Sequence, residues 1–221
     1  MSLDESSTSE LRAPLAIYSG TDFAESICTR FKLQLIEPAW DLLAKMPFEL
    51  RLRSVQLSTI GEFAVRENPC FVKPADPRRR VFDAGIYRSA GDIGLRKPLP
   101  RDFPILISDP VEFSAEYRLF ISDGKIHAGS PYVVSGRPVW QPFGKGGEKA
   151  ALNNSVVGFA HRLHTACSDK LPTVYVVDVG LIEGRGWAIV EFNPIWCSGI
   201  LGANPDKVLD VLERAVVPLS D

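Results

Sequence analysis

The chain has 221 residues, of which 45% are hydrophobic, which suffices for one compact domain or two small ones. Its formal charge of −2 does not favour nucleic acid or an acidic membrane as a partner. No apolar run approaches the roughly 20 residues that span a bilayer. The polar opening MSLDESSTSE lacks a secretory signal, so residues 1–12 are expected to be disordered. Four scattered cysteines, without a CxxC pair, indicate free thiols and a cytoplasmic protein.

Helix-like and strand-like segments follow one another without internal repeats. Helices are predicted at 21–33 with Thr21 as cap, 58–66 with Ser58 as cap, 153–166 with an Asn cap, and from Pro205 after the cap Asn204. Strands are predicted at 13–20, 33–40, 70–73, 81–88 and 103–108, in a hairpin over 115–134 that turns at Asp123-Gly124, and in a second hairpin over 173–194, with a long loop at 136–148. Long antiparallel hairpins in place of repeated βαβ units predict an α+β fold.

The second hairpin, "DVGLIEGRGWAIVEFNP", carries acids among apolar residues. A turn of two or four residues centred on Gly184-Arg185 places Asp178 directly opposite Glu191, and Asn193 lies two residues further along the same face. A turn of three residues would shift the register and break this alignment. The predicted hairpin therefore brings three oxygen-bearing side chains together.

Opposed carboxylates repel one another, and a divalent cation between them removes the repulsion. Mg²⁺ prefers hard oxygen ligands and completes its shell with water and phosphates. Asp178, Glu191 and Asn193 are therefore a candidate metal site for Mg²⁺, with Mn²⁺ as an alternative. The competing interpretation is a set of exposed polar residues on a solvated face, which the apolar flanking sequence disfavours.

Basic residues elsewhere fit phosphate binding. Lys73 ends an apolar strand and can act as a flexible point charge, although lysines also simply mark strand ends. Glu116 and Arg118 share a strand face, either as a surface ion pair or with Arg118 holding a phosphate oxygen. The run at 78–80 is either a solvated charge cluster or part of a lid over a nucleotide.

Several familiar motifs are missing. The GKGGEK segment at 144–149 does not meet the GxxxxGK[ST] pattern of a P-loop, and no GxGxxG follows a strand. His161 and His164 lie three apart without a nearby third ligand, which disfavours zinc. No GxSxG elbow or catalytic cysteine context is present.

Taken in order, "FVKP", "PILIS", "DPVEF", "EYRLFISDGKI", "VVDVG" and "AIVEFNP" resemble the ATP-grasp superfamily over roughly residues 50–217. The resemblance implies an ATP-grasp fold, in which two α+β lobes with antiparallel sheets grip the nucleotide. The implied division is a disordered N-terminus at 1–12, a short pre-grasp α/β segment at 13–55 and an ATP-grasp domain at 56–221.

The resemblance also implies roles for individual residues. Lys73 matches the lysine near the α-phosphate, and Arg118 matches the arginine near the γ-phosphate, so these two are the candidate catalytic residues. Asp178, Glu191 and Asn193 match the Mg²⁺ ligands. The other residues implied in nucleotide binding are Arg53, Arg80, Glu116 and the hinge residues Ser108, Pro110, Val111 and Glu112.

The implied function is an ATP- and Mg²⁺-dependent carboxylate–amine ligase that acts on an amino acid or peptide through an acyl-phosphate. The alternatives are an ATP-grasp kinase and a non-catalytic nucleotide-binding or interaction module. Residues 13–55 are shorter than the family's usual substrate-side domain. That leaves a homodimer or a partner chain to complete the acceptor site, with no nucleic acid or membrane partner.

Overall fold

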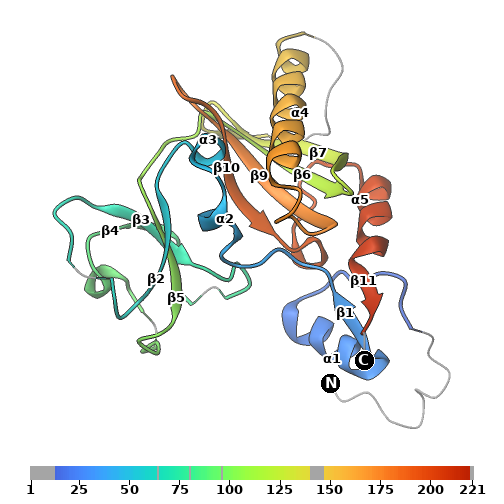
Figure 1. The fold of residues 1–221 in the computed structure, drawn as a ribbon, viewed down its shortest axis with the longest axis horizontal. Helices are drawn as coiled ribbons and strands as arrows, with labels where there is room; N and C mark the ends of the chain where they lie inside the picture. Colours follow the sequence, from blue (N-terminus) through green and yellow to red (C-terminus); the bar gives the residue numbers. More distant parts are fainter. Residues whose placement is uncertain (1–12, 64, 80, 96, 140–146, 220–221) are drawn as a thin grey trace.

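The computed structural model describes residues 13–63, 65–79, 81–95, 97–139 and 147–219 (Figure 1). Two lobes lie side by side, one around a four-stranded sheet and one around a five-stranded sheet, and a small two-stranded sheet lies at the chain ends. None of the helices in these ranges has an apolar stretch of the length that a bilayer crossing requires. The α+β class and the antiparallel pairing predicted from the sequence are confirmed.

The smaller lobe is an antiparallel sheet in the order β2-β5-β3-β4. Its strands are β2 (Val55–Thr59), β3 (Cys70–Pro74), β4 (Gly85–Tyr87) and β5 (Pro104–Ser108). One face packs on a core that includes Phe63, Val72 and Ile105, beside a 3-10 turn at Ala90–Asp92. The other face, which includes Lys73, points toward the larger lobe.

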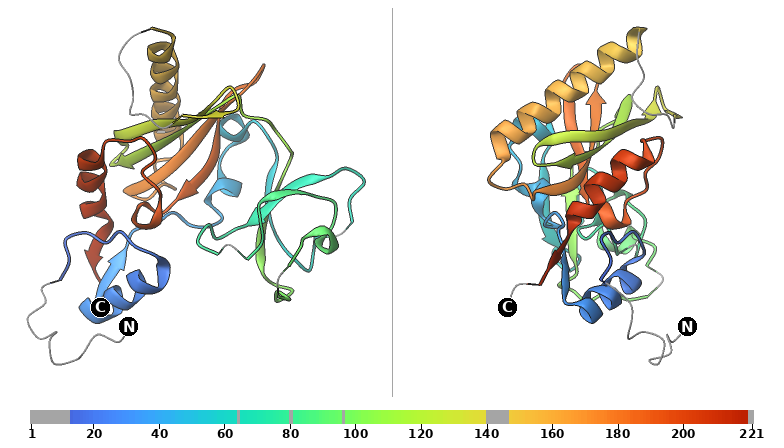
Figure 2. Two further views of the ribbon diagram at one scale, coloured as in Figure 1. Left: turned by 180° about the vertical axis from the view of Figure 1, so that it is seen from behind. Right: turned by 90° about the vertical axis from the view of Figure 1, so that its right-hand side faces the viewer.

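The larger lobe is an antiparallel sheet in the order β10-β9-β6-β7-β8. Its elements are β6 (Ala115–Ser122), β7 (Lys125–Val134), β8 (Arg137–Pro138), α4 (Gly147–Cys167), β9 (Val174–Ile182), β10 (Gly186–Asn193) and α5 (Pro205–Leu212). Apolar residues of α4 pack on one face, whereas α5 covers part of the other (Figure 2). The uncovered part of that second face borders the smaller lobe.

The N-terminal segment packs against the end of the chain. It contains α1 (Thr21–Phe31), β1 (Leu33–Leu35), α2 (Leu42–Lys45) and α3 (Phe48–Arg51). Strand β1 pairs antiparallel with β11 (Val216–Pro218), which follows α5 and a 3-10 turn at Glu213–Ala215. Helices α2 and α3 lie against β10, so this segment supports the larger lobe (Figure 2).

Several predicted elements are wrong in detail. Residues 13–20 form no strand, because a single backbone bond from Ser19 to Trp196 ties them down instead of a ladder. Residues 58–66 are not a helix: β2 runs through Thr59, and Ile60 and Phe63 reach the core from a turn. The supposed loop at 136–148 includes β8 and the start of α4.

The helix caps are partly as expected. Asn204 caps α5, since its side chain accepts a bond from the Lys207 amide at 3.2 Å, with Pro205 at the first helical position. Thr21 is not a cap, because it lies inside α1 after Gly20. Helix α4 begins at Gly147, so no asparagine near residue 153 caps it.

Asn204→Ala should therefore destabilise the protein by about 1 kcal/mol, because it leaves a helix-end amide without its partner. Thr21→Ala is the matched control and should stay within about 0.5 kcal/mol, since Thr21 makes no cap bond. Urea denaturation measures both. Equal losses for the two variants would contradict this assignment.

The hairpin of β9 and β10 reaches the predicted register by an unpredicted route. Gly186 pairs with Ile182, so the turn has three residues, Glu183 to Arg185, and the expectation of an even turn is wrong. The register then shifts between Ile189 and Glu191. This β-bulge adds one residue to β10 and restores the pairing of Glu191 with Asp178.

Candidate active site

Three charged side chains form a row across the open face of the larger sheet. Arg118 on β6 pairs in register with Asp178 on β9, and Asp178 pairs with Glu191 on β10. Directly opposed residues share a face, so the row points toward the smaller lobe. Asn193 joins the row by donating a hydrogen bond to Glu191 at 3.0 Å. The predicted convergence of Asp178, Glu191 and Asn193 is thus present.

Asp178 is the most buried member of the row, with 1% of its surface exposed. Arg118 holds it through two hydrogen bonds, from Nε at 2.8 Å and from Nη2 at 2.7 Å, and Nη1 also donates to the Gly199 carbonyl at 3.0 Å. Burial raises the pKa of Asp178 to about 6, while Arg118 opposes that shift. The carboxylate is therefore ionised at neutral pH because Arg118 is beside it.

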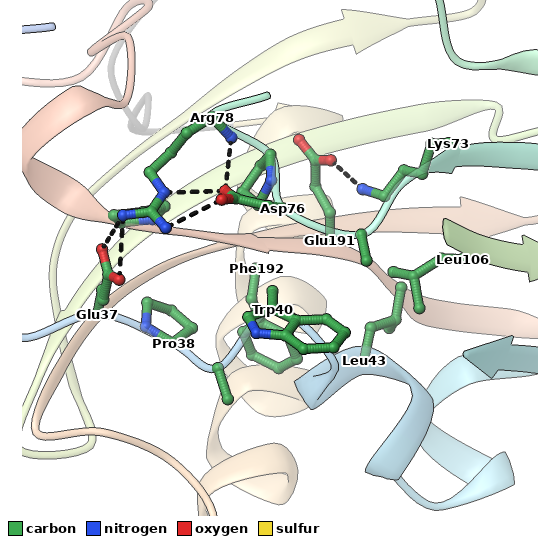
Figure 3. Close-up of a pocket in the computed structure, with 14 residues that line it drawn as sticks. Glu37, Pro38, Trp40, Leu43, Lys73, Asp76, Arg78, Leu106, Glu191 and Phe192 are labelled. Atoms are coloured by element: carbon green, nitrogen blue, oxygen red, sulfur yellow. Dashed lines mark hydrogen bonds and ion pairs between the residues drawn. The ribbon is translucent and has the colours of Figure 1, made fainter. Parts of the chain in front are cut away.

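Glu191 joins the two lobes. Its Oε2 lies 2.5 Å from Lys73 Nζ, which comes from the smaller lobe (Figure 3). Burial favours a raised pKa for Glu191, but Lys73 and the Asn193 bond outweigh it and lower the pKa to about 2. The surface ion pair of Glu116 and Arg118 that the sequence left open is not formed, since Arg118 pairs with Asp178.

Two cavities meet at the Lys73–Glu191 pair. A largely apolar cavity of about 290 Å³ lies between the sheets and is lined by residues that include Phe71, Leu106 and Phe113. A polar cavity of about 350 Å³ lies on the other side and reaches Arg118 and Asn193. Lys73 and Glu191 line both, so a ligand with an apolar and a polyanionic end can extend across the pair.

The donor set fits a hard divalent cation. Two carboxylates and an amide oxygen are the ligand types that Mg²⁺ takes in small number from protein. Within the described ranges, no group of three His, Cys, Asp or Glu side chains could hold a metal, and the row differs in that its third donor is an amide. Arg118 and Lys73 neutralise the two carboxylates, which explains how the row is stable by itself.

The predicted hinge lies beside the apolar cavity. Ser108 and Val111 line it, whereas Pro110 and Glu112 do not. Glu112 borders a different, more open groove, with Ser135 and Glu183. The structure therefore brings two of the four hinge residues to the cavity wall.

Glu116 faces the same apolar cavity. Burial raises the pKa of its carboxyl, although the Tyr132 hydroxyl donates a hydrogen bond to it at 2.6 Å. Tyr132 also lies under the Arg118 guanidinium, 6.0 Å from the ring centroid. The buried Glu116–Tyr132 pair thus extends the charged row into the cavity.

The three-arginine run at 78–80 is not the solvated cluster or lid that its sequence suggested. Arg78 makes two bonds to Asp76, each 2.9 Å long, and an ion pair with Glu37 at 3.3 Å (Figure 3). Arg79 is largely exposed, and Arg80 lies outside the described residues. Arg78 therefore anchors the loop after β3 to the chain between β1 and α2.

Sequence reasoning missed residues that complete the site. Phe113 and Asp109 belong to the hinge region, and the Ser54 amide donates to the Asp109 carboxylate at 2.9 Å. Tyr132 lies on β7, where only pairing with β6 brings it to Glu116. Local spacing carries no signal for such long-range contacts.

Phe113 packs directly on Gly180 of β9, where a Cβ would overlap its ring. Gly180→Ala should therefore displace Phe113 from the cavity wall, cost about 1–3 kcal/mol of stability and weaken nucleotide binding. Gly158→Ala in α4 is the control, since its Cβ meets only a distant Arg162 atom, and it should be neutral or stabilising. Denaturation and calorimetry measure the two effects. A Gly180→Ala protein with unchanged stability would contradict the close contact.

Two antiparallel sheets that face each other across a lysine, an arginine and paired carboxylates define the class of ATP-grasp domains. A family model described as an ATP-grasp domain, the second family of its clade, matches residues 50–211. The chain belongs to that family.

Solved structures with the same kind of fold are distant. D-alanine–D-alanine ligase from Helicobacter pylori is 17% identical, with 90% of this chain and 67% of that one covered and a TM-score of 0.48. The same enzyme from Bacillus anthracis, complexed with ATP, is 14% identical, with 75% and 59% covered and a TM-score of 0.45. A truncated Cdc123 from Schizosaccharomyces pombe is 20% identical, with 44% and 36% covered and a TM-score of 0.29. The chain thus spans 36% to 67% of the length of these proteins. No curated protein matches the chain.

Proposed function

We propose that this protein is an ATP- and Mg²⁺-dependent carboxylate–amine ligase that acts on an amino acid or a peptide. The observation that carries the proposal is the row of Arg118, Asp178 and Glu191, with Lys73 beside it, at the junction of an apolar and a polar cavity. The family supports an ATP-binding ligase in outline. The substrate classes are part of the proposal.

The apolar cavity suits the adenine ring. Phe71 and Leu106 provide apolar contact, and the backbone near Ser108 and Val111 can offer hydrogen bonds to the base edge. A base in this position directs the phosphates toward Lys73 and Glu191. The polar cavity beyond them is then left for the carboxylate and the amine.

The charged row exchanges partners when phosphates arrive. Lys73 and Arg118 turn from the carboxylates to phosphate oxygens, which they bind as point charge and fork respectively. Asp178, Glu191 and Asn193 then hold Mg²⁺, which supplies positive charge to the phosphates. The pairs seen in the structure thus keep each charge compensated before binding.

The chemistry needs alignment and charge neutralisation more than covalent help from protein. A substrate carboxylate oxygen attacks the γ-phosphorus, the bond to the β-phosphate oxygen breaks, and ADP leaves. The amine nitrogen then attacks the acyl carbon, phosphate leaves with the bonding pair, and the amine loses a proton. Arg118 stabilises the charge on the transferring group from its position beside Asp178.

The test is a screen of amino acids and short peptides for ADP release with Mg²⁺-ATP, with products identified by mass spectrometry. A product that has lost one water relative to its two substrates supports the ligase. A phosphorylated product without ligation would replace it with a kinase. Tight ATP binding without ADP release across the panel would indicate a binding module.

A further inference from the structure

The alignment of the two carboxylates depends on the single extra residue in β10. The register counted from the turn is offset by one, and the shift at Val190 corrects it just before Glu191. A bulge disrupts the ladder locally, so its backbone groups need other partners. Whatever binds those groups holds Glu191 opposite Asp178.

Arg53 supplies that contact. Its Nη1 donates to the Ile189 carbonyl at 2.7 Å, and its Nη2 donates to the Val190 carbonyl at 3.1 Å. A third bond runs from Nη1 to the Arg51 carbonyl at 3.1 Å. The residue is 6% exposed, and its guanidinium lies 5.3 Å from the centroid of the Phe113 ring. Both carbonyls at the register shift are therefore bound by one buried side chain.

The neighbours of Arg53 extend the same link. The Leu52 carbonyl accepts a bond from Arg185 in the hairpin turn at 3.2 Å, and the Ser54 amide bonds Asp109 in the hinge. Residues 52–54 thus connect the turn, the bulge and the hinge in one short stretch. That stretch joins α3 to β2, so it also spans the two lobes.

We propose that Arg53 is a positioning residue that holds the β10 bulge and thereby the Glu191 carboxylate, instead of a phosphate ligand. The proposal rests on the proposed function, because the quantity it governs is the Mg²⁺-dependent part of nucleotide affinity. It replaces the role in phosphate binding that the sequence suggested for Arg53.

The residue type agrees with this role. A planar guanidinium can donate to two neighbouring carbonyls at once, whereas a lysine ammonium is a point charge without that geometry. Burial lowers the pKa of Arg53 to about 10, so the group stays charged at neutral pH. A phosphate ligand would tolerate lysine, and a holder of the bulge would not.

The experiment measures ADP affinity of the full chain by calorimetry, once with EDTA and once with saturating Mg²⁺. For Arg53→Lys and Arg53→Gln we expect metal-free affinity within about twofold of wild type, and a loss of roughly 10- to 100-fold in the gain from Mg²⁺. Wild-type Mg²⁺ gain in Arg53→Lys would overturn the proposal. Equal loss of affinity with and without Mg²⁺ would make Arg53 a direct phosphate ligand and also overturn it.

Arg51→Gln is the matched control. Arg51 also donates to backbone carbonyls, those of Val55 at 2.7 Å and Ala44 at 3.4 Å, and neither of these lies on β10. Its replacement should cost stability yet leave the Mg²⁺ gain unchanged, and an equal loss of that gain would overturn the specific role of Arg53. A wild-type protein without any Mg²⁺ gain would instead refute the proposed function.

Hydrogen exchange of the wild-type protein tests the link without a variant that risks misfolding. Adding Mg²⁺ to the ADP complex should slow amide exchange at residues 189–193 and at residues 52–54 together. Slowing at 189–193 alone would show that Arg53 does not couple the two segments, and the proposal would be wrong.

Discussion

Replacing Glu191 by glutamine is expected to remove most of the Mg²⁺-dependent affinity for ATP, by roughly 10- to 100-fold, together with the ligase activity. The side chain keeps its size and can still accept a bond from Asn193, but it loses the negative charge that both a cation and Lys73 require. Calorimetry with and without Mg²⁺ measures the first effect, and ADP release measures the second.

Glu183→Gln is the control for this experiment. Glu183 lies in the turn of the same hairpin, is exposed, and does not line either of the two cavities that meet at Lys73. The control should match wild type in affinity and activity. If Glu191→Gln keeps wild-type Mg²⁺–ATP affinity, Glu191 is no metal ligand and the assignment of this row fails.

The hairpin shows what sequence reasoning reaches and where it ends. Apolar alternation and the glycines at the turn identified both strands, and they led to the correct opposition of Asp178 and Glu191. The turn length was wrong, and an unseen bulge compensated for it. A bulge depends on a partner for its exposed carbonyls, here Arg53, which is over a hundred residues away in sequence.

The smaller lobe gives a second example. Ile60 and Phe63 have helical spacing after a potential cap at Ser58, yet the chain forms β2 and a turn. Pairing of β2 with β5 extends each strand's ladder and places Leu57 opposite Leu106. Such tertiary pairing overrides a local preference of a few tenths of a kcal/mol per residue.

Isolated charges were the least predictable part of the site. Arg78 looked like a member of a solvated run, but Asp76 and Glu37 bind it in a partly buried cluster. Lys73 was identified by its place at a strand end, whereas its ion pair with Glu191 depends on the approach of two lobes. Strand ends are visible in sequence, and the approach of lobes is not.

Arg118→Met is expected to cost about 3–5 kcal/mol of stability, because it leaves the Asp178 carboxylate buried without its partner. The same change should lower the ligase rate by about 10²- to 10³-fold, since it removes a fixed donor to the transferring phosphoryl group. Urea denaturation and ADP release measure the two losses separately.

The double variant Arg118→Met with Asp178→Asn separates stability from function. Removing both charges takes away the uncompensated carboxylate, so most of the lost stability should return. Activity should not return, because both the phosphate donor and a metal ligand are missing. If the double variant recovers activity with stability, the row is structural and the catalytic role of Arg118 is wrong. If Arg118→Met alone is as stable as wild type, the bond to Asp178 contributes no net stability and the electrostatic account of the row fails.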